Sequence, residues 1–361
     1  MDLELLDQTL ADRDEPRFRA RQVWIWAARG ARGYEQMTDL PASLREALAR
    51  ELPFSSLTLQ AEAQASDGTV KALFATADGR PLEAVLMRYR DGRRSLCLSS
   101  QSGCALACTF CATGRMPFAR NLSASEIVDQ ALHFRRAEAA RGGQRGTAGA
   151  KAPRGRDGTA GPAAITHCAF MGMGEPMLNL DNVLAACERL PDIGIGHRRT
   201  TISTVGWIPG IERLAEEQMP LRLALSLHAA DEALRSELMP VNERFPLRDV
   251  IDACRAFHER KRRRVFVEYV MLAGVNDRYE QALALADVLS RGHGGGRSAR
   301  PVFKVNLIPY NPTDSPYTGS TREAIASFRR ALEARGIPCT VRLTRGREID
   351  AACGQLAARC R

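Results

Sequence analysis

Strand-like and helix-like segments alternate through the second half of this chain, and this alternation constrains the fold more than any other feature. Apolar strand-like segments fall at 165–171, 200–203, 221–226, 265–272, 302–308 and 340–343. Helical periodicity falls at 124–139, 180–190, 208–217, 247–260, 279–290 and 321–335. Repeated βα units imply a parallel sheet with right-handed crossovers. Six or so units are too few for a closed eight-stranded barrel. We therefore expect an α/β fold with a partial (βα)6 TIM-like barrel, and a doubly wound sheet is the alternative.

Two other kinds of segment precede the barrel. Residues 16–52 show helical spacing, whereas residues 57–100 alternate with period two between Asp-Gly pairs at 67–68, 78–79 and 91–92. Asp-Gly between alternating segments is a hairpin signal. The predicted organisation is a helical module (1–56), a β-meander (57–100), the barrel (101–345) and a C-terminal loop (346–361).

Composition places the chain among soluble enzymes. Its 361 residues are 45% hydrophobic and 26% charged, which is ordinary for a globular protein. The acidic N-terminus lacks a signal-peptide core, and no apolar run reaches the ~18 residues that a membrane-spanning helix needs. Ten cysteines without a secretory signal indicate metal or redox chemistry in a reducing compartment. We expect a cytoplasmic protein with no membrane partner.

The net charge of +9 favours an anionic partner such as nucleic acid. The charge is unevenly spread, because seven basic and only two acidic side chains fall within residues 135–157. The segment 140–161 consists mainly of Gly, Ala, Arg and Pro, a composition that cannot bury a core. We expect it to be a flexible insert in the barrel.

Three cysteines, Cys104, Cys108 and Cys111, lie within eight residues. Iron–sulfur clusters usually have four cysteine ligands, so three would leave one iron of a four-iron cluster open. This C-x3-C-x2-C spacing is typical of radical S-adenosylmethionine (SAM) enzymes, in which SAM occupies the open iron. The alternative is a zinc knuckle with Cys97 or a distant residue as fourth ligand.

Polar groups and glycines follow the predicted strands, at the edge where βα barrels place their active sites. The glycines let a ligand approach the backbone, and the polar side chains can bind an amino-acid head, a ribose and an adenine. Each group could equally be a turn or a satisfied buried side chain. The candidate SAM-binding residues are Gly174, Glu175, Ser203, Ser226, Leu227, His228 and Asn311.

Of the seven remaining cysteines, Cys360 lies next to the C-terminal residue and has no assigned role, and the other six divide into two groups. Cys168, Cys187, Cys254 and Cys339 fall in strand or helix patterns and fit the role of small apolar residues. Cys97 precedes the three-cysteine run, and Cys353 lies close to the C-terminus. Nothing in the composition indicates that these two meet.

Several motifs, in order, resemble the RlmN and Cfr family of radical SAM methyltransferases, which modify RNA. The resemblance runs from about residue 16 to 357, and it also covers Ser226-Leu-His and the run from Cys97 to Cys111. The segment 140–161 is longer than the family's usual connection. The longest matching motifs are Phe18-Arg-Ala-Arg-Gln-Val, Met171-Gly-Met-Gly-Glu-Pro, Val305-Asn-Leu-Ile-Pro-Tyr-Asn-Pro and Ile349-Asp-Ala-Ala-Cys-Gly-Gln-Leu.

The resemblance implies a barrel of the radical SAM type, one [4Fe-4S] cluster and two SAM molecules per turnover. One SAM would methylate Cys353, and the other would yield the radical that activates this methyl group for attack on adenine C2. Glu83 matches the base that removes the C2 proton. Cys97 would then attack the Cys353 sulfur, which releases the product and leaves a disulfide bond. Such an exchange needs the two Cα atoms within about 7 Å of each other.

The implied partners are 23S ribosomal RNA, transfer RNA and an external electron donor such as flavodoxin, with the enzyme as a monomer. RNA would contact the N-terminal module and the basic run 260–264, although that run could also be a solvated helix end. Two other functions stay open: methylation at C8, as in Cfr, and a zinc-stabilised RNA-binding protein without catalysis.

Overall fold

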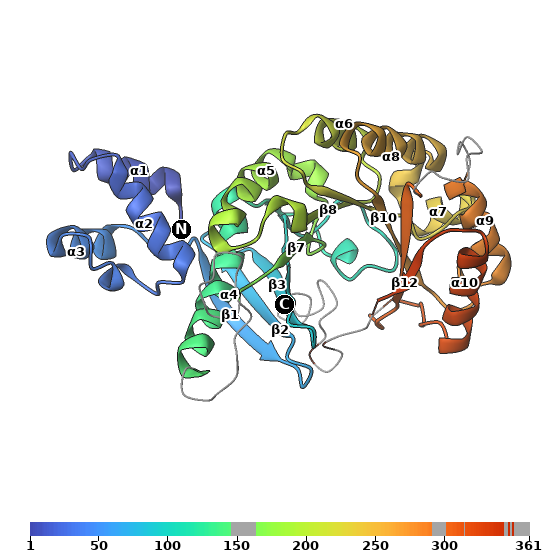
Figure 1. Ribbon diagram of the computed structural model, residues 1–361, viewed down its shortest axis with the longest axis horizontal. Helices are drawn as coiled ribbons and strands as arrows, with labels where there is room; N and C mark the ends of the chain where they lie inside the picture. The colour runs from blue at the N-terminus through green and yellow to red at the C-terminus, as the bar shows by residue number, and fades with distance from the viewer. Residues whose placement is uncertain (146–163, 291–300, 314, 343–345, 347–348, 350–361) are drawn as a thin grey trace.

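The computed structural model describes residues 1–145, 164–290, 301–313, 315–342, 346 and 349 (Figure 1). One ten-stranded sheet runs in the order β1-β2-β3-β4-β7-β8-β9-β10-β11-β12, and β5 (Gln101–Ser102) pairs with β6 (Arg120–Asn121) in a small second sheet. The strands of the large sheet are β1 (Leu57–Gln64), β2 (Val70–Thr76), β3 (Pro81–Arg88), β4 (Arg94–Cys97), β7 (His167–Phe170), β8 (Thr200–Thr204), β9 (Arg222–Ser226), β10 (Val265–Met271), β11 (Phe303–Pro309) and β12 (Cys339–Val341).

Within the large sheet, β4 and the strands from β7 to β12 are all parallel, and each lies beside the next strand of that sheet along the chain. A doubly wound sheet would reverse this order at a switch point, so the partial barrel is confirmed and the doubly wound alternative is wrong. In Figure 1 the helices follow the outer side of the curved sheet. They are α4 (Ala124–Arg145), α5 (Leu180–Arg189), α6 (Ile208–Glu216), α7 (Glu232–Leu238), α8 (Leu247–Lys261), α9 (Tyr279–Ser290) and α10 (Arg322–Ala334).

The predicted meander is present, but it is continuous with the barrel. Strand β4 pairs antiparallel with β3 and parallel with β7, so it serves both parts. The hairpin turns contain Gly68, Gly79 and Gly92, with φ values of 83°, 76° and 84°. Glycine is favoured there because a Cβ atom makes this backbone region costly. The parallel array therefore begins one strand earlier than the sequence pattern indicates.

The N-terminal module contains α1 (Leu3–Ala11), α2 (Phe18–Arg29) and α3 (Ala42–Glu51). The sequence pattern does not predict helix α1. Trp24 of α2 joins the module to the barrel, because its indole N–H donates to Asp192 at 2.7 Å.

Helix α4 extends to Arg145, so the first residues of the predicted insert 140–161 are helical. The predicted helix 124–139 is therefore too short, because the helix continues past residue 139 into the predicted insert. The segment 146–161 lies outside the described residues. Among those described, no helix has the length and apolarity to cross a membrane.

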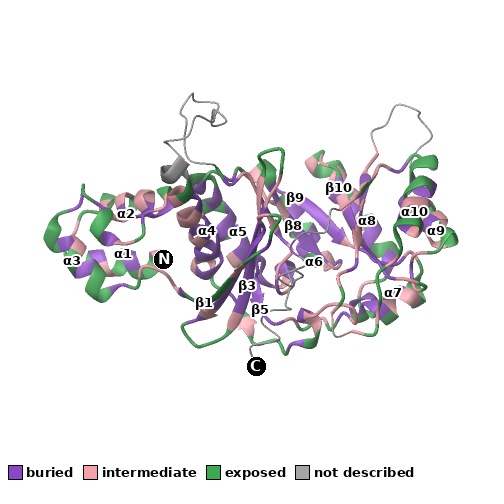
Figure 2. Ribbon diagram, turned by 90° about the horizontal axis from the view of Figure 1, so that it is seen from below, coloured by how far each residue is buried: buried purple, intermediate pink, exposed green. Residues whose placement is uncertain are grey.

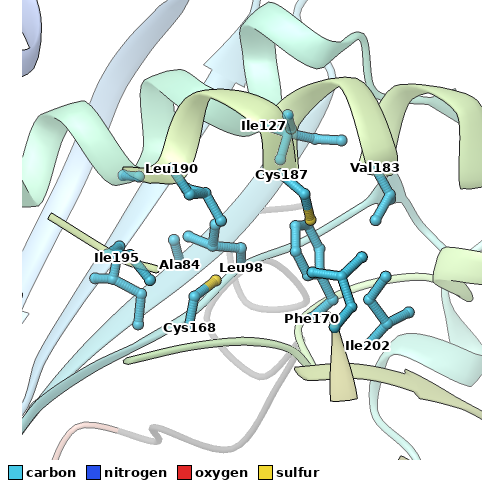
Figure 3. Packing of buried hydrophobic residues seen from close by; sticks show 14 of the residues in the cluster. Ala84, Leu98, Ile127, Cys168, Phe170, Val183, Cys187, Leu190, Ile195 and Ile202 are labelled. Atoms are coloured by element: carbon cyan, nitrogen blue, oxygen red, sulfur yellow. The ribbon is translucent and has the colours of Figure 1, made fainter. Parts of the chain in front are cut away.

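The core lies between the sheet and the surrounding helices, and Figure 2 shows buried positions concentrated along the strands. Cys168 of β7 and Cys187 of α5 lie in this core beside Leu98, Phe170 and Ile202 (Figure 3). Burial raises the pKa of both thiols well above the ordinary value. These two cysteines act as small apolar side chains, as predicted.

Candidate active site

A cavity of about 340 Å³ opens at the carboxyl ends of the parallel strands, the edge where βα barrels place their active sites. Strands β4 and β9 end in Cys97 and Ser226, and both residues line it. The other predicted residues in the lining are Cys108, Cys111, Gly174, Glu175, Ser203, His228 and Asn311. Side chains far apart in the sequence therefore meet in one cavity.

The loop that carries the three cysteines is fixed against the barrel. The backbone N–H of Thr109 donates to the Leu238 carbonyl at 3.0 Å, and its hydroxyl lies 2.9 Å from the hydroxyl of Tyr317. The hydroxyl of Tyr310 donates to the Phe110 carbonyl at 3.3 Å. These contacts come from α7 and from the chain after β11, so they hold the loop over the strand ends.

The three thiols can hold an iron–sulfur cluster. Cys108 and Cys111 line the cavity, and Cys104 is half-buried beside them. Burial raises the pKa of Cys104 to about 11, and the neighbouring Cys111 adds to this rise. Since the thiolate is the metal ligand, loading iron must release these protons.

A single zinc ion fits these residues poorly. Among the described residues, no three His, Cys, Asp or Glu side chains converge as the ligands of one ion do. Zinc needs its sulfur ligands at about 2.3 Å, whereas cysteines that hold the corners of a four-iron cluster stand further apart. The donor set of three thiols beside an open cavity therefore fits the cluster better than the zinc knuckle.

The chain after β7 approaches its neighbours so closely that two positions require glycine. A Cβ atom on Gly172 would lie 2.5 Å from the Leu98 carbonyl oxygen. One on Gly174 would lie 2.4 Å from Gln101 Cβ, and Gly174 also has φ of +92°. Real Cβ atoms do not come this close. Close packing therefore requires glycine at positions 172 and 174, in addition to any need for space around a ligand.

Glu175 is buried at the cavity wall. Its carboxylate accepts from the backbone N–H of Met177 at 3.1 Å and of Val205 at 3.0 Å. Burial nevertheless raises its pKa to about 7, because desolvation disfavours the charged form. A cationic ligand group in the cavity would stabilise the carboxylate, so Glu175 suits the amino group of SAM.

His228 is a neutral donor in a fixed orientation. Its Nδ1 accepts the backbone N–H of Val270 at 3.1 Å, and its ring meets Phe110 edge-to-face at 4.8 Å. Burial lowers its pKa to about 3. A backbone N–H can only donate, so Nδ1 carries no proton and Nε2 carries the proton of the neutral ring.

The side chain of Leu227 does not line the cavity, and its place in the SAM-binding site stays a prediction. Its side chain is fully buried in the core, and its backbone N–H donates to the Glu268 carbonyl at 3.0 Å. Alternation along the strand explains this, since Ser226 and Leu227 point to opposite faces. Ser203 lines the cavity and donates through its hydroxyl to the Phe170 carbonyl.

Sequence reasoning missed two charged groups at the cavity. Glu268 of β10 is buried, and burial raises its pKa, while nearby Arg342 opposes this rise. Asn306 donates to its carboxylate at 2.9 Å. Arg342 follows β12, and its guanidinium lies 3.9 Å from Met171 Sδ and 4.0 Å from Met87 Sδ. A lone charge in the apolar run 265–271 is the signal that could have identified Glu268.

Glu83 is not among the residues that line the cavity. Its carboxylate pairs with Lys71 Nζ at 2.8 Å, and both side chains are buried. The register pairs Val85 with Cys97, and Glu83 lies two residues from Val85 on the same face of β3. The structure thus places Glu83 and Cys97 on one face of the sheet. Cys353 lies outside the described residues.

Known sequence families match both parts of the chain. The profile of the ribosomal RNA large subunit methyltransferase N-terminal domain matches residues 1–52, and that of the Radical SAM superfamily matches residues 160–286. The first range coincides with the helices α1 to α3, and the second falls within the parallel array.

Relatives of similar length share much of the sequence. A probable dual-specificity RNA methyltransferase RlmN from Chloroflexus aurantiacus is 47% identical over 99% of this chain and 91% of its own length. One from Thermus thermophilus is 42% identical over 98% and 92%. The crystal structure of a radical SAM methyltransferase from Sphaerobacter thermophilus superposes with a TM-score of 0.84, at 42% identity over 98% of this chain and 97% of that one. The chain therefore belongs to the RlmN family of radical SAM RNA methyltransferases.

Proposed function

We propose that this enzyme methylates C2 of an adenine in 23S ribosomal RNA and in transfer RNA, with Cys353 as the carrier of the methyl carbon. The observation that carries the proposal is the position of Cys97, which lines the same cavity as Cys108 and Cys111. A resolving thiol is useful only where the carrier and the radical source are both in reach.

The chain that leads to Cys353 supports this role. Arg342 contacts Met87 and Met171 at the cavity, and further along, the backbone N–H of Gly346 donates to Asp67 in the β1–β2 turn at 3.1 Å. The chain thus passes from the last strand of the sheet to its first hairpin. Cys353 follows Ile349 by four residues, which extended chain spans in at most about 14 Å.

The cluster would be held by Cys104, Cys108 and Cys111, and when bound it would supply the electron that cleaves SAM. Gly174 and Glu175 would take the amino group of SAM. Ser203, Ser226 and Asn311 would bind its carboxylate and ribose, and His228 would donate from Nε2. Two SAM molecules would be used per turnover, one for Cys353 and one as radical source.

The remaining steps belong to three side chains. The Cys353 thiolate would accept the methyl group by displacement, since the thiolate is the nucleophile. After the carbon has bonded to adenine, Glu83 would take the C2 proton from its buried position beside Lys71. The Cys97 thiolate would then attack the Cys353 sulfur and form the disulfide that frees the product.

The partners follow from this chemistry. Adenine must leave its stack to reach the cavity, so the bound RNA should be distorted. An external one-electron donor such as flavodoxin would reduce the cluster. We further propose that the enzyme acts as a monomer in the cytoplasm.

Product analysis tests the proposal. The protein is reconstituted anaerobically with iron and sulfide, supplied with SAM and RNA, and the RNA is digested for mass spectrometry. We expect 2-methyladenosine; 8-methyladenosine would overturn the C2 assignment, and the absence of SAM cleavage would favour a non-catalytic RNA-binding protein. Cys353→Ala should abolish methyl transfer, whereas the matched control Cys339→Ala should keep it. Unchanged transfer by the Cys353 variant would refute the carrier role.

A further inference from the structure

A second hollow lies at the opposite end of the strands from the catalytic cavity. It measures about 390 Å³ and is lined by Arg222, His258, Arg262, Arg263, Arg264, Phe266, Pro301 and Lys304. We call it the basic cleft. Arg222 begins β9, and Ser226, which ends the same strand, lines the catalytic cavity. Four residues of strand separate the two openings, which is about 13 Å at the usual rise.

The cleft concentrates positive charge. Five of its eight lining residues are Arg or Lys, and none is Asp or Glu. Within the described part of the chain, no carboxylate forms an ion pair with Arg222, Arg263 or Lys304. The pKa values of Arg222 and Arg263 are lowered, first by burial and then by further arginines nearby. Unbalanced cations held together in a hollow favour an anionic ligand.

The local structure keeps these cations in place. Helix α8 ends at Lys261, and Arg262 follows with φ of 54°. His258 of that helix bonds the Arg263 carbonyl at 2.8 Å, and Arg264 Nε donates to the Pro301 carbonyl at 3.2 Å. The turn therefore holds residues 262–264 in positions where all three line the cleft.

Two other basic side chains of this region have structural partners. Arg260 pairs with Glu216 at 3.5 Å, and Lys261 donates to the Met219 carbonyl at 3.3 Å. The predicted basic run 260–264 therefore has two parts. Its first two residues contact the end of α6 and the chain after it, and its last three line the cleft.

We infer that the basic cleft binds the phosphate backbone of the RNA substrate at a second point, away from the catalytic cavity. Arg198 and Arg199, both exposed, extend the positive charge beyond the hollow toward Arg263 and Arg222, so more than one phosphate finds a partner. Phe266 is half-buried, and the Arg222 guanidinium carbon lies over its ring, 6.0 Å from the ring centre. The aromatic ring offers a surface against which a base can pack. The inference rests on an RNA substrate but not on the carbon that is methylated.

Salt-dependent binding tests this site. Reconstituted Arg263→Gln/Lys304→Gln protein is compared with wild type and with Arg322→Gln/Arg330→Gln, which removes two exposed charges on α10. Affinity for a full-length transfer RNA transcript is measured against KCl concentration. Each lost phosphate contact makes the slope of log K against log salt shallower by ~0.7–0.9. We expect the cleft variant to bind about tenfold more weakly at 0.1 M salt, with a slope shallower by about 1.5.

A second readout separates binding from damage to the fold. The cleft variant should show a raised KM for RNA, an unchanged kcat at saturating RNA and unchanged SAM cleavage without RNA. The Arg263→Lys/Lys304→Arg variant, which keeps both charges, should bind like wild type. Wild-type RNA affinity and salt slope in the cleft variant would overturn the inference. So would unchanged RNA binding with slower reduction by flavodoxin, because the cleft would then dock an acidic protein. The position of the methyl group enters none of these measurements.

Discussion

Lys71 Nζ lies 2.8 Å from the Glu83 carboxylate on the neighbouring strand, and both side chains are inaccessible to solvent. Strands β2 and β3 carry the pair on the face that bears Val85 and Met87, which line the cavity. A buried charge without its partner is costly. The pair therefore holds the Glu83 carboxylate in place on the sheet face that lines the cavity.

Lys71→Met should leave the Glu83 carboxylate without its cation and lower the free energy of unfolding by about 3–5 kcal/mol. Urea denaturation of the apoprotein measures this loss. The double variant Lys71→Met/Glu83→Gln should recover a large part of it, because the unpaired charge is gone. Equal loss in the single and double variants would show that the charge is not the cause.

Gly174→Ala should weaken SAM binding at least tenfold, because the new Cβ atom would lie 2.4 Å from Gln101 Cβ at a residue with φ of +92°. Backbone strain of this kind costs ~1–3 kcal/mol. Equilibrium binding of SAM to the reconstituted enzyme gives the readout. Gly196→Ala is the matched control, since a Cβ atom at that position would meet nothing within 4 Å and its φ is −66°. Wild-type affinity in the Gly174 variant would contradict the packing argument.

The titration of His228 makes the free energy of unfolding depend on pH. Its pKa is about 3 in the folded protein against 6.5 in the unfolded chain, so between these values the unfolded state binds the extra proton. Its contribution is therefore fully present above pH 6.5 and is lost as the pH falls toward 3, by up to ~1.4 kcal/mol per pH unit. Unfolding free energies of wild type and His228→Gln from pH 4 to 7 should converge as the pH falls. Parallel curves would rule out this titration.

Cys97→Ala should trap the RNA on the enzyme, since no thiolate is then available to attack the Cys353 sulfur. A denaturing gel should show a protein band of reduced mobility that returns to normal after nuclease treatment. The Cys339→Ala control should give free product and no such band. Product release at the wild-type rate from the Cys97 variant would assign the resolving role to another group.

Local patterns determined much of the architecture. The Asp-Gly pairs predicted the hairpin turns at Gly68, Gly79 and Gly92, and the strand-like segments of the barrel all became strands. These predictions of turns and strands are confirmed because turn chemistry and apolar periodicity act over a few residues. The sequence pattern did not predict helix α1 or the continuation of α4. Intrinsic helix propensity is weak in short segments, so packing against other elements decides whether such a segment is helical.

The sequence by itself determined which residue types stand at the carboxyl ends of the strands, and with the family resemblance it determined the class of chemistry. Only the tertiary structure decided which of them share the cavity. It placed the side chain of Leu227 in the core and outside the cavity lining, because alternation along the strand turns this side chain to the other face. It added Glu268 and Arg342, and it paired Glu83 with Lys71. The reason is physical: spacing along a chain fixes local geometry, whereas contacts between residues tens or hundreds of positions apart depend on how the strands pack into one sheet.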